Sequence, residues 1–435
     1  MTVRAGRPLL FGLHAAAIVV LVAAVVAQVD RPLAPASPPR LDAEALFGAD
    51  YLARVRAYRA PRSLVRLAVL LVGVAVPAWW GLSAPGRRLT ARLAARWGAH
   101  RPLRAAAVVA VTLLVAIDLV ALPLVFWAGF VQEGQYGFRT QGLGGWLRDW
   151  LVVRAPVWLG VAVATPVVLA VVRRLPRAWP PLLGLSAGVA TAGLTLVAPL
   201  VLEPLWLTAT PLPPGQVRQE VELVVARAQV PVDRILVGDA SRRSTKANAY
   251  VSGLGGTRRV VLFDTLLARA APEEIAVVVA HELAHDVHGD IARGVLLGAA
   301  GGVVSAYALA FALRRATAGG AVTGATDPRA VPLAVALLLL LTTLSLPLQS
   351  AVSRRAEAAA DWAALELTRD PAAFAGMQRA LATSHLSDPD PPGWEHWLWF
   401  THPPAADRLA LAAEWARRNG HAVPVSPSTT VAPRP

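Results

Sequence analysis

The chain has 435 residues, of which 55% are hydrophobic and only 16% are charged, and it contains no cysteine. Soluble domains carry about 25% charged residues, so this deficit indicates a membrane protein, and the missing cysteines exclude disulfides and thiolate chemistry. The formal net charge is +14, but the basic residues stand at the ends of apolar runs rather than along one polar face. We attribute them to membrane anchoring and expect no nucleic-acid partner.

Seven apolar segments are long enough to cross a lipid bilayer, whose hydrocarbon core of about 30 Å needs about 20 residues of helix. They lie near residues 8–28, 67–84, 105–131, 155–172, 181–202, 291–313 and 330–350. Arginines bracket most of these segments, and tryptophans cluster at several of their ends, as in the aromatic belts of membrane proteins. The predicted fold class is therefore mainly α, a polytopic bundle of transmembrane helices.

Three of the segments need separate interpretation. The first could be a cleaved signal peptide, but its apolar stretch of about 20 residues is longer than a signal peptide needs, which favours a retained anchor. The third contains Asp118, for which the sequence leaves open a functional role or a hydrogen bond to a neighbouring helix. The sixth has four glycines between residues 294 and 302, which favour close helix packing.

The segments divide the chain into three parts. Residues 1–202 hold the first five spans, with polar, arginine-rich connections predicted at 29–66 and 85–104. Residues 203–420 have the composition of a soluble domain that the last two spans interrupt, and residues 421–435 have that of a disordered tail. Within the second part we predict a helix over 216–229 and short strands at 235–237, 249–252 and 259–263.

Residues 281–285 read His-Glu-Leu-Ala-His within a predicted helix. Because positions i and i+4 share one helix face, His281 and His285 can offer imidazole nitrogens to the same metal ion. Glu282 is rotated by about 100° from His281 and is placed to take a proton from a water molecule, as a general base does. The alternatives are a chance match to this motif and a histidine pair that packs at the membrane interface.

A catalytic zinc ion needs a third protein ligand and one open position. Residues 353–361 read Ser-Arg-Arg-Ala-Glu-Ala-Ala-Ala-Asp, which places Glu357 and Asp361 on one face of a predicted helix. Glu357 could bind the metal while Asp361 accepts a hydrogen bond from a ligand histidine. From spacing alone, an ordinary solvated pair of acids remains an equal alternative.

The two motifs together resemble those of the membrane gluzincin metallopeptidases, the family of the type I CAAX prenyl endopeptidases and the bacterial protease HtpX. The resemblance extends to Asn-Ala-Tyr-Val-Ser-Gly-Leu at 248–254, Arg-Val-Val-Leu-Phe-Asp-Thr-Leu at 259–266, and Thr-His-Pro-Pro at 401–404 with Arg408. It covers roughly residues 205–410 and implies a zincin-like catalytic domain that contains a small β-sheet beside the membrane helices.

The resemblance also implies a role for each site residue. One zinc ion would be held by His281, His285 and Glu357, with Glu282 as the general base and Asp361 as a hydrogen-bond acceptor behind a ligand.

The substrate is implied less directly. The strand around Asn248 and Ala249 would pair with its backbone, and His402 and Arg408 would hold it or stabilise the oxyanion. Position 290 is Asp, as in HtpX-like members, where prenyl endopeptidases typically carry histidine.

We therefore expect a zinc-dependent endopeptidase that spans the cell membrane several times and cleaves a peptide or a membrane protein. Both CAAX-type processing and membrane-protein quality control fit this expectation. The alternatives are a signalling sensor, although no ligand-binding domain is visible after residue 410, and a non-enzymatic scaffold with a zinc site. The positive-inside rule weakly favours an outward-facing catalytic domain, whereas the resemblance to HtpX favours the opposite side.

Overall fold

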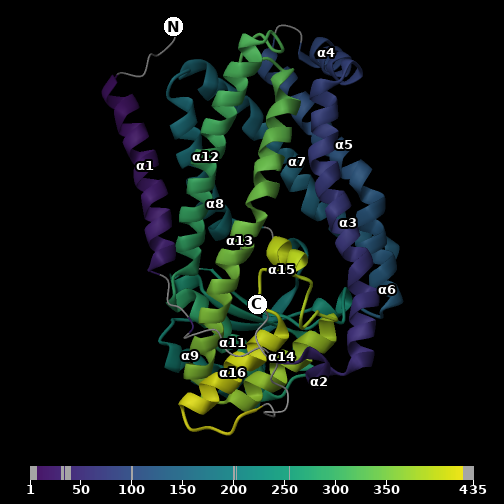
Figure 1. Cartoon of the computed structure of the whole chain (residues 1–435), viewed down its shortest axis with the longest axis vertical. Helices are drawn as coiled ribbons and strands as arrows, with labels where there is room; N and C mark the ends of the chain where they lie inside the picture. Colours follow the sequence, from purple (N-terminus) through teal and green to yellow (C-terminus); the bar gives the residue numbers. More distant parts are fainter. Residues whose placement is uncertain are drawn as a thin grey trace.

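The computed structural model of the chain describes residues 7–30, 34, 41–98, 101–198, 201, 203–253 and 255–424. Parts of both predicted connections, the end of the predicted fifth span, Leu254, and the predicted tail from residue 425 onward lie outside these residues. Long helices form one end of the molecule, and a smaller domain with a sheet forms the other (Figure 1).

The N-terminal helices are α1 (Arg7–Val29), α2 (Ala43–Phe47), α3 (Ala49–Leu82), α4 (Ala84–Gly98), α5 (Pro102–Phe126), the π-helical turn η1 (Trp127–Gln132), α6 (Glu133–Gln135), α7 (Leu143–Arg174) and α8 (Trp179–Val197). The following elements are η3 (Glu203–Leu205), β1 (Ala209–Pro211), α9 (Gln216–Ala228), β2 (Arg234–Gly238), η4 (Ala240–Arg242), β3 (Ala249–Ser252), η5 (Gly255–Thr257), β4 (Arg259–Phe263), α10 (Asp264–Leu267) and α11 (Pro272–Val287). The chain continues with α12 (Asp290–Ala318), α13 (Ala330–Thr368), α14 (Pro371–His385), α15 (Gly393–Trp399) and α16 (Ala405–Arg418).

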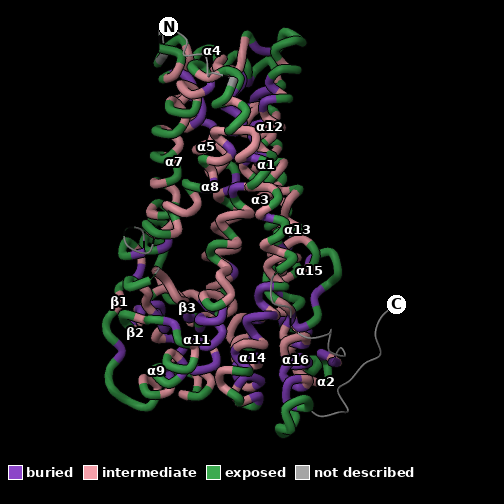
Figure 2. Tube along the Cα trace, turned by 90° about the vertical axis from the view of Figure 1, so that its left-hand side faces the viewer, coloured by how far each residue is buried: buried purple, intermediate pink, exposed green. Residues whose placement is uncertain are grey.

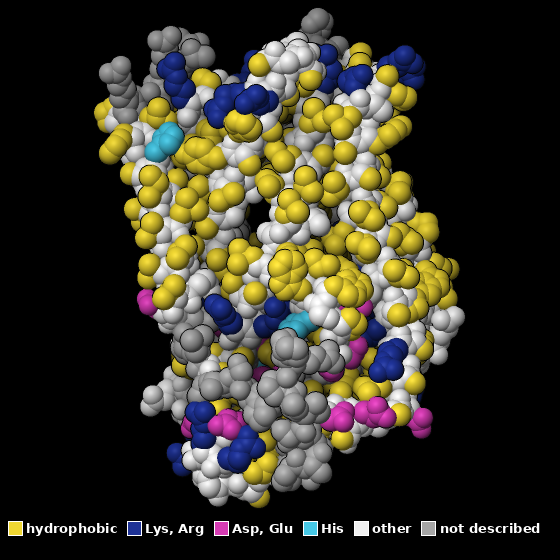
Figure 3. Space-filling model, viewed as in Figure 1, with side chains coloured by type: hydrophobic (Ala, Val, Ile, Leu, Met, Phe, Trp, Pro, Cys, Tyr) yellow, Lys and Arg dark blue, Asp and Glu magenta, His cyan; other side chains and the backbone are white. Residues whose placement is uncertain are grey.

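Seven helices in the described part of the chain are long and apolar enough to cross a membrane, which confirms the predicted bundle. They run over Pro8–Val29, Ala49–Leu82, Pro102–Gln135, Leu143–Arg174, Trp179–Val197, Asp290–Ala318 and Ala330–Thr368. In Figure 3, hydrophobic side chains cover these helices, and Lys and Arg side chains gather at the end away from the domain. This distribution is that of a multi-pass integral membrane protein.

Both predicted polar connections are largely helical where the structure describes them, which the sequence analysis did not predict. α3 begins at Ala49, before the apolar run, because Leu52, Val55 and Tyr58 recur at helical spacing and bury one face, while Arg54 and Arg56 are exposed. The second connection forms α4, whose arginines lie along a short amphipathic helix. Hydropathy marks where a helix enters lipid, but it does not mark where the helix begins.

Helices α8 and α12 pack closely through small residues, as the glycines of the sixth segment predicted. A Cβ added at Gly184 would lie 2.6 Å from the Cα of Val303, and one added at Gly302 would lie 2.5 Å from the Cβ of Ala187. Gly301 faces open space, so only part of the glycine run serves this contact. Without a hydrophobic force between helices in lipid, such close approach supplies the packing energy.

Asp118 is held within the bundle by helix α7. The Trp158 indole donates a hydrogen bond of 2.7 Å to one carboxylate oxygen, and the Arg154 Nε lies 3.4 Å from the other. These contacts support the hydrogen bond to a neighbouring helix, the structural alternative that the sequence left open for Asp118.

The sheet has four strands in the order β1-β2-β4-β3. β2 and β4 pair in parallel, whereas β1 with β2 and β3 with β4 pair antiparallel. The three predicted strands are present, but β1 was missed because its three residues include Pro211 and show no alternating pattern. β3 therefore stands at one edge of the sheet, and it packs against α11.

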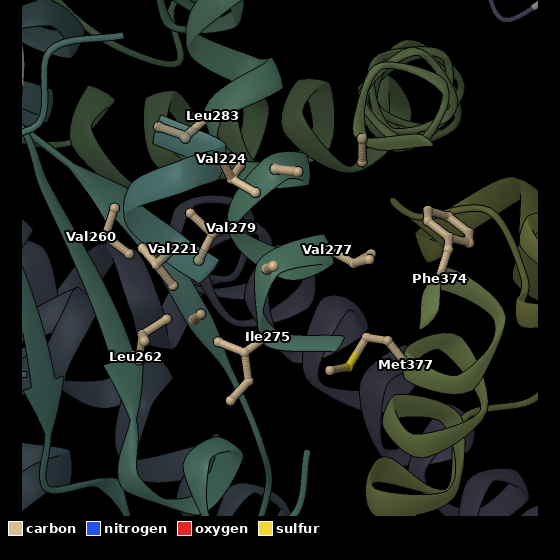
Figure 4. Packing of buried hydrophobic residues seen from close by; sticks show 14 of the residues in the cluster. Val221, Val224, Val260, Leu262, Ile275, Val277, Val279, Leu283, Phe374 and Met377 are labelled. Atoms are coloured by element: carbon tan, nitrogen blue, oxygen red, sulfur yellow. The ribbon is translucent and has the colours of Figure 1, made fainter. Parts of the chain in front are cut away.

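The core of the domain surrounds helix α11. Its side chains Ile275 and Val279 are fully buried on the side of Val221 of α9 and Leu262 of β4, and Val277 faces Phe374 of α14 (Figure 4). Burying a side chain of this size stabilises the fold by about 1.5–3 kcal/mol, so α11 is fixed on several sides. Figure 2 shows buried residues concentrated in the domain, whereas the membrane helices are more exposed.

Helix α13 connects the membrane to this core. Its 39 residues span about 58 Å at 1.5 Å per residue, far more than the hydrocarbon core of a bilayer. The helix does not end at residue 350, where the apolar run ends, but continues to Thr368 and carries Glu357 and Asp361 into the domain.

Candidate active site

The three predicted metal ligands lie together at the meeting point of α11 and α13. The Nε2 atom of His281 is 3.1 Å from Oε2 of Glu357 and 3.2 Å from Nε2 of His285. The Nε2 atom of His285 is 3.7 Å from Oε1 of Glu357. One ligand atom from each residue can be chosen so that all lie within 4.8 Å of one another.

This donor set fits a metal ion. Two imidazole nitrogens and a carboxylate oxygen suit a divalent transition metal, and all three approach one point from two helices. His281 is 7% exposed and Glu357 8% exposed. A buried carboxylate needs a positive partner, which is either a protonated imidazole or a metal cation. His285 is half-buried, which leaves this side of the site open.

The start of helix α11 is capped so that its histidines are held in place. Pro272 occupies the first turn, and the Glu274 side chain accepts a hydrogen bond of 3.0 Å from the Ala271 backbone N–H. The buried apolar face of α11 then fixes its rotation, so His281 points into the domain and Glu282, one residue later, remains half-buried beside it.

Each of the two histidines contacts an aspartate through its Nδ1 atom. The Nδ1 atom of His281 lies 2.9 Å from Oδ1 of Asp361, which is fully buried. Burial lowers the pKa of His281, but its hydrogen bonds to Asp361 and Glu357 outweigh burial and raise the pKa to about 10. A carboxylate at Nδ1 turns Nε2 toward the metal position and makes it a stronger ligand.

The sequence analysis noted Asp290 but missed its contact with His285. Its Oδ2 atom lies 2.8 Å from Nδ1 of His285, so it corresponds to Asp361 at the other histidine. Gly289, between α11 and α12, adopts a positive φ of 65°. This turn directs Asp290, the first residue of α12, back toward His285. An acid five residues after His285 is visible in the sequence. Its contact with His285 could not be predicted without knowing the conformation of Gly289.

Replacing Asp290 with Asn should lower metal affinity or cleavage rate about 10- to 100-fold, because His285 loses the charged acceptor that orients its ring. Metal titration with a competing chelator measures the effect. Asp286→Asn is the matched control, because Asp286 is on α11 but pairs with Arg258 at 2.9 Å. Equal losses in both variants would argue against an orienting role for Asp290.

His402 and Arg408 reach the site from opposite sides. Nδ1 of His402 lies 2.7 Å from Oε2 of Glu357, and its side chain is 61% exposed, so it faces the open side. Arg408 lies behind His281, where its Nε donates a hydrogen bond of 2.8 Å to Oδ2 of Asp361. The geometry therefore allows His402 to contact a substrate, whereas Arg408 holds Asp361 in place.

Asn248 and Ala249 lie at the start of the edge strand β3. The Asn248 carbonyl accepts a hydrogen bond of 3.0 Å from the Phe263 N–H, and its side chain accepts one of 2.9 Å from the Ala249 N–H. Among the described residues, β3 has a strand partner on one edge only. The other edge can add a peptide strand beside α11.

The chain is similar to known proteins over most of its length. A model described as "CAAX prenyl protease N-terminal, five membrane helices" matches residues 53–207, and the model of peptidase family M48 matches residues 211–416. Among curated relatives, a CAAX prenyl protease 1 homolog of Oryza sativa subsp. japonica is 32% identical over 167 residues, 37% of this chain and 38% of the relative. CAAX prenyl protease 1 of Saccharomyces cerevisiae is 33% identical over 171 residues, 38% of this chain and 37% of the relative.

A bacterial relative, the uncharacterized metalloprotease YhfN of Bacillus subtilis, is 28% identical over 172 residues, 38% of each chain. These alignments span well under half of each relative. The crystal structure of S. mikatae Ste24p matches with a TM-score of 0.72 at 21% identity, over 92% of this chain and 98% of that one. That match shows a shared fold, with membrane helices and domain combined in the same way.

Proposed function

We propose that the chain, which matches the models of peptidase family M48 and of the CAAX prenyl protease N-terminal region, is an integral-membrane, zinc-dependent endopeptidase of that family. The observation that carries the proposal is the convergence of His281, His285 and Glu357 within 4.8 Å, next to the half-buried carboxylate of Glu282. These two imidazoles and one carboxylate would hold a zinc ion with a further position free for water or substrate, as catalytic zinc sites require.

The zinc ion, when bound by these residues, would supply Lewis acidity toward a substrate carbonyl. Glu282 would take the proton of the attacking water and return it to the leaving amine. His402, exposed on the open side, would donate to the developing negative oxygen, which such donors stabilise by several kcal/mol. Asp361 and Asp290 would keep the two histidines in the tautomer that presents Nε2.

We propose that the substrate is a peptide segment that pairs with the open edge of β3 near Asn248 and Ala249. The relatives named CAAX prenyl protease 1 favour a protein C-terminus of the CAAX type, and quality control of membrane proteins remains the second use of the same site. The cell membrane is the proposed location, which cell fractionation tests.

The experiment is cleavage by the purified full chain in detergent, combined with metal analysis. We expect one zinc ion per chain, cleavage of a peptide with a CAAX terminus, loss of cleavage with a chelator and its return when zinc is added. The same peptide with and without a prenyl group reports whether the lipid contributes to recognition. Cleavage that survives complete removal of the metal would contradict the proposal.

A further inference from the structure

A basic cavity of about 170 Å³ lies outside the residues assigned to the metal site. It is lined by Tyr58, Arg59, Arg62, Ser63, Arg66, Lys246, His385 and Ser387. The three arginines recur on α3 at i, i+3 and i+7, so they share one face of that helix. Lys246, the only lysine of the chain, meets them from the segment that leads into β3.

The cavity holds more positive than negative charge. Glu133 pairs with two of its cations, since its carboxylate lies 2.7 Å from Nη1 of Arg62 and 2.7 Å from Nζ of Lys246. Glu395 and Asp388 lie near enough to Arg59 to interact with it electrostatically, as Glu395 does with Arg66, but neither arginine forms a direct ion pair among the described residues. The Nε atom of Arg59 is buried and lacks a hydrogen-bond partner there. A buried, unpartnered guanidinium nitrogen is costly, which points to an anionic ligand.

The position of the cavity connects it to the substrate path rather than to the lipid surface. The Nε2 atom of His385 lies 2.7 Å from the carbonyl oxygen of Ala247, directly before the edge strand β3. On another side, the Arg59 guanidinium lies 4.7 Å from the ring centroid of Phe400, two residues before His402. A peptide on the edge of β3 therefore has one of its ends close to these cations.

We propose that this cavity binds the C-terminal carboxylate of the substrate, an inference that rests on the function proposed above. A peptide that adds antiparallel to β3 directs its C-terminus toward residue 249 and so toward Lys246 and the arginines. Arginine binds carboxylates through two parallel hydrogen bonds, and Arg59 and Arg66 form no direct ion pair with Glu133 or with the nearby Glu395 and Asp388. The cavity thus selects substrates cleaved close to a free C-terminus.

The test compares two peptides that differ only in a terminal carboxylate or carboxamide. The native chain should cleave the carboxylate form about 10- to 100-fold more efficiently, as measured by kcat/KM, because one charge-assisted contact is lost with the amide. In the double variant Arg59→Gln with Arg66→Gln, this ratio should fall to about one, and with Lys at both positions most of it should return. Arg54→Gln with Arg56→Gln is the matched control, because both residues are exposed on the same helix.

Binding of the same peptides, followed by fluorescence anisotropy, separates this inference from the proposed function. Selective binding of the carboxylate without cleavage would support the cavity and contradict the peptidase. Equal cleavage of both peptides by the native chain would overturn the cavity assignment and leave the peptidase intact. A lipid headgroup as the true ligand would also overturn it: the double Gln variant would then lose activity on both peptides equally, and only in anionic nanodiscs.

Discussion

Glu282→Gln should lower the rate of peptide cleavage by about 10²- to 10⁴-fold while the chain keeps its metal. The carboxylate lies one residue after His281 on α11, too far round the helix to be a third ligand with His285, so its loss leaves the donor set complete. An amide of the same shape cannot accept a proton from water. Steady-state kinetics and metal stoichiometry on the same sample give both readouts.

The matched control is Glu273→Gln at the exposed start of the same helix, which changes charge equally but lies far from the histidines. It should cleave at the native rate. If the Glu282→Gln variant retained native activity, the general-base assignment would be removed. If that variant lost its metal, Glu282 would be shown to contribute to binding rather than to proton transfer.

The histidine pair could be predicted from the sequence because a single helix fixes it. His281 and His285 are one turn apart, and no tertiary information is needed to place both rings on one face. Glu357 is different, since it is 76 residues from His281 and its spacing to Asp361 fits an ordinary acid pair equally well. Only the family resemblance joined it to the histidines, and the packing of α11 against α13 is what brings them together.

The seven spans could also be predicted, because lipid imposes a length and an apolar composition on every crossing helix. Helix ends could not, because α3 and α13 continue into polar sequence where burial against the domain replaces lipid. The arginine face of α3 was consequently interpreted as part of a connection, and the basic cavity could not be anticipated. The contact of Asp290 with His285 could not be predicted either, because it depends on the left-handed conformation of Gly289.

The extension of α13 also has a functional consequence. A helix anchored in the membrane at one end carries Glu357 and Asp361 at the other, where it packs against α11 and brings Glu357 next to His281 and His285. Placing a ligand on a rigid helix rather than on a loop keeps it within the narrow tolerance that a metal site requires. The site is therefore a joint product of bundle and domain.

Asp361→Ala should be the most destabilising single change at the site, costing about 3–5 kcal/mol in the free energy of unfolding. Asp361 is fully buried and binds both Arg408 and Nδ1 of His281, so its removal leaves a buried guanidinium without a counter-charge and an imidazole without its acceptor. Thermal unfolding in detergent measures the first effect, and metal titration measures the second.

The double variant Asp361→Leu with Arg408→Met separates these two effects. Replacing both charges with apolar side chains of similar volume removes the unpaired guanidinium, so most of the lost stability should return. Metal affinity should not return, because Nδ1 of His281 still lacks the carboxylate that directs its Nε2 atom toward the metal. A double variant as unstable as Asp361→Ala would show that the buried charge of Arg408 is not the cause, and recovery of full metal affinity would show that His281 needs no partner.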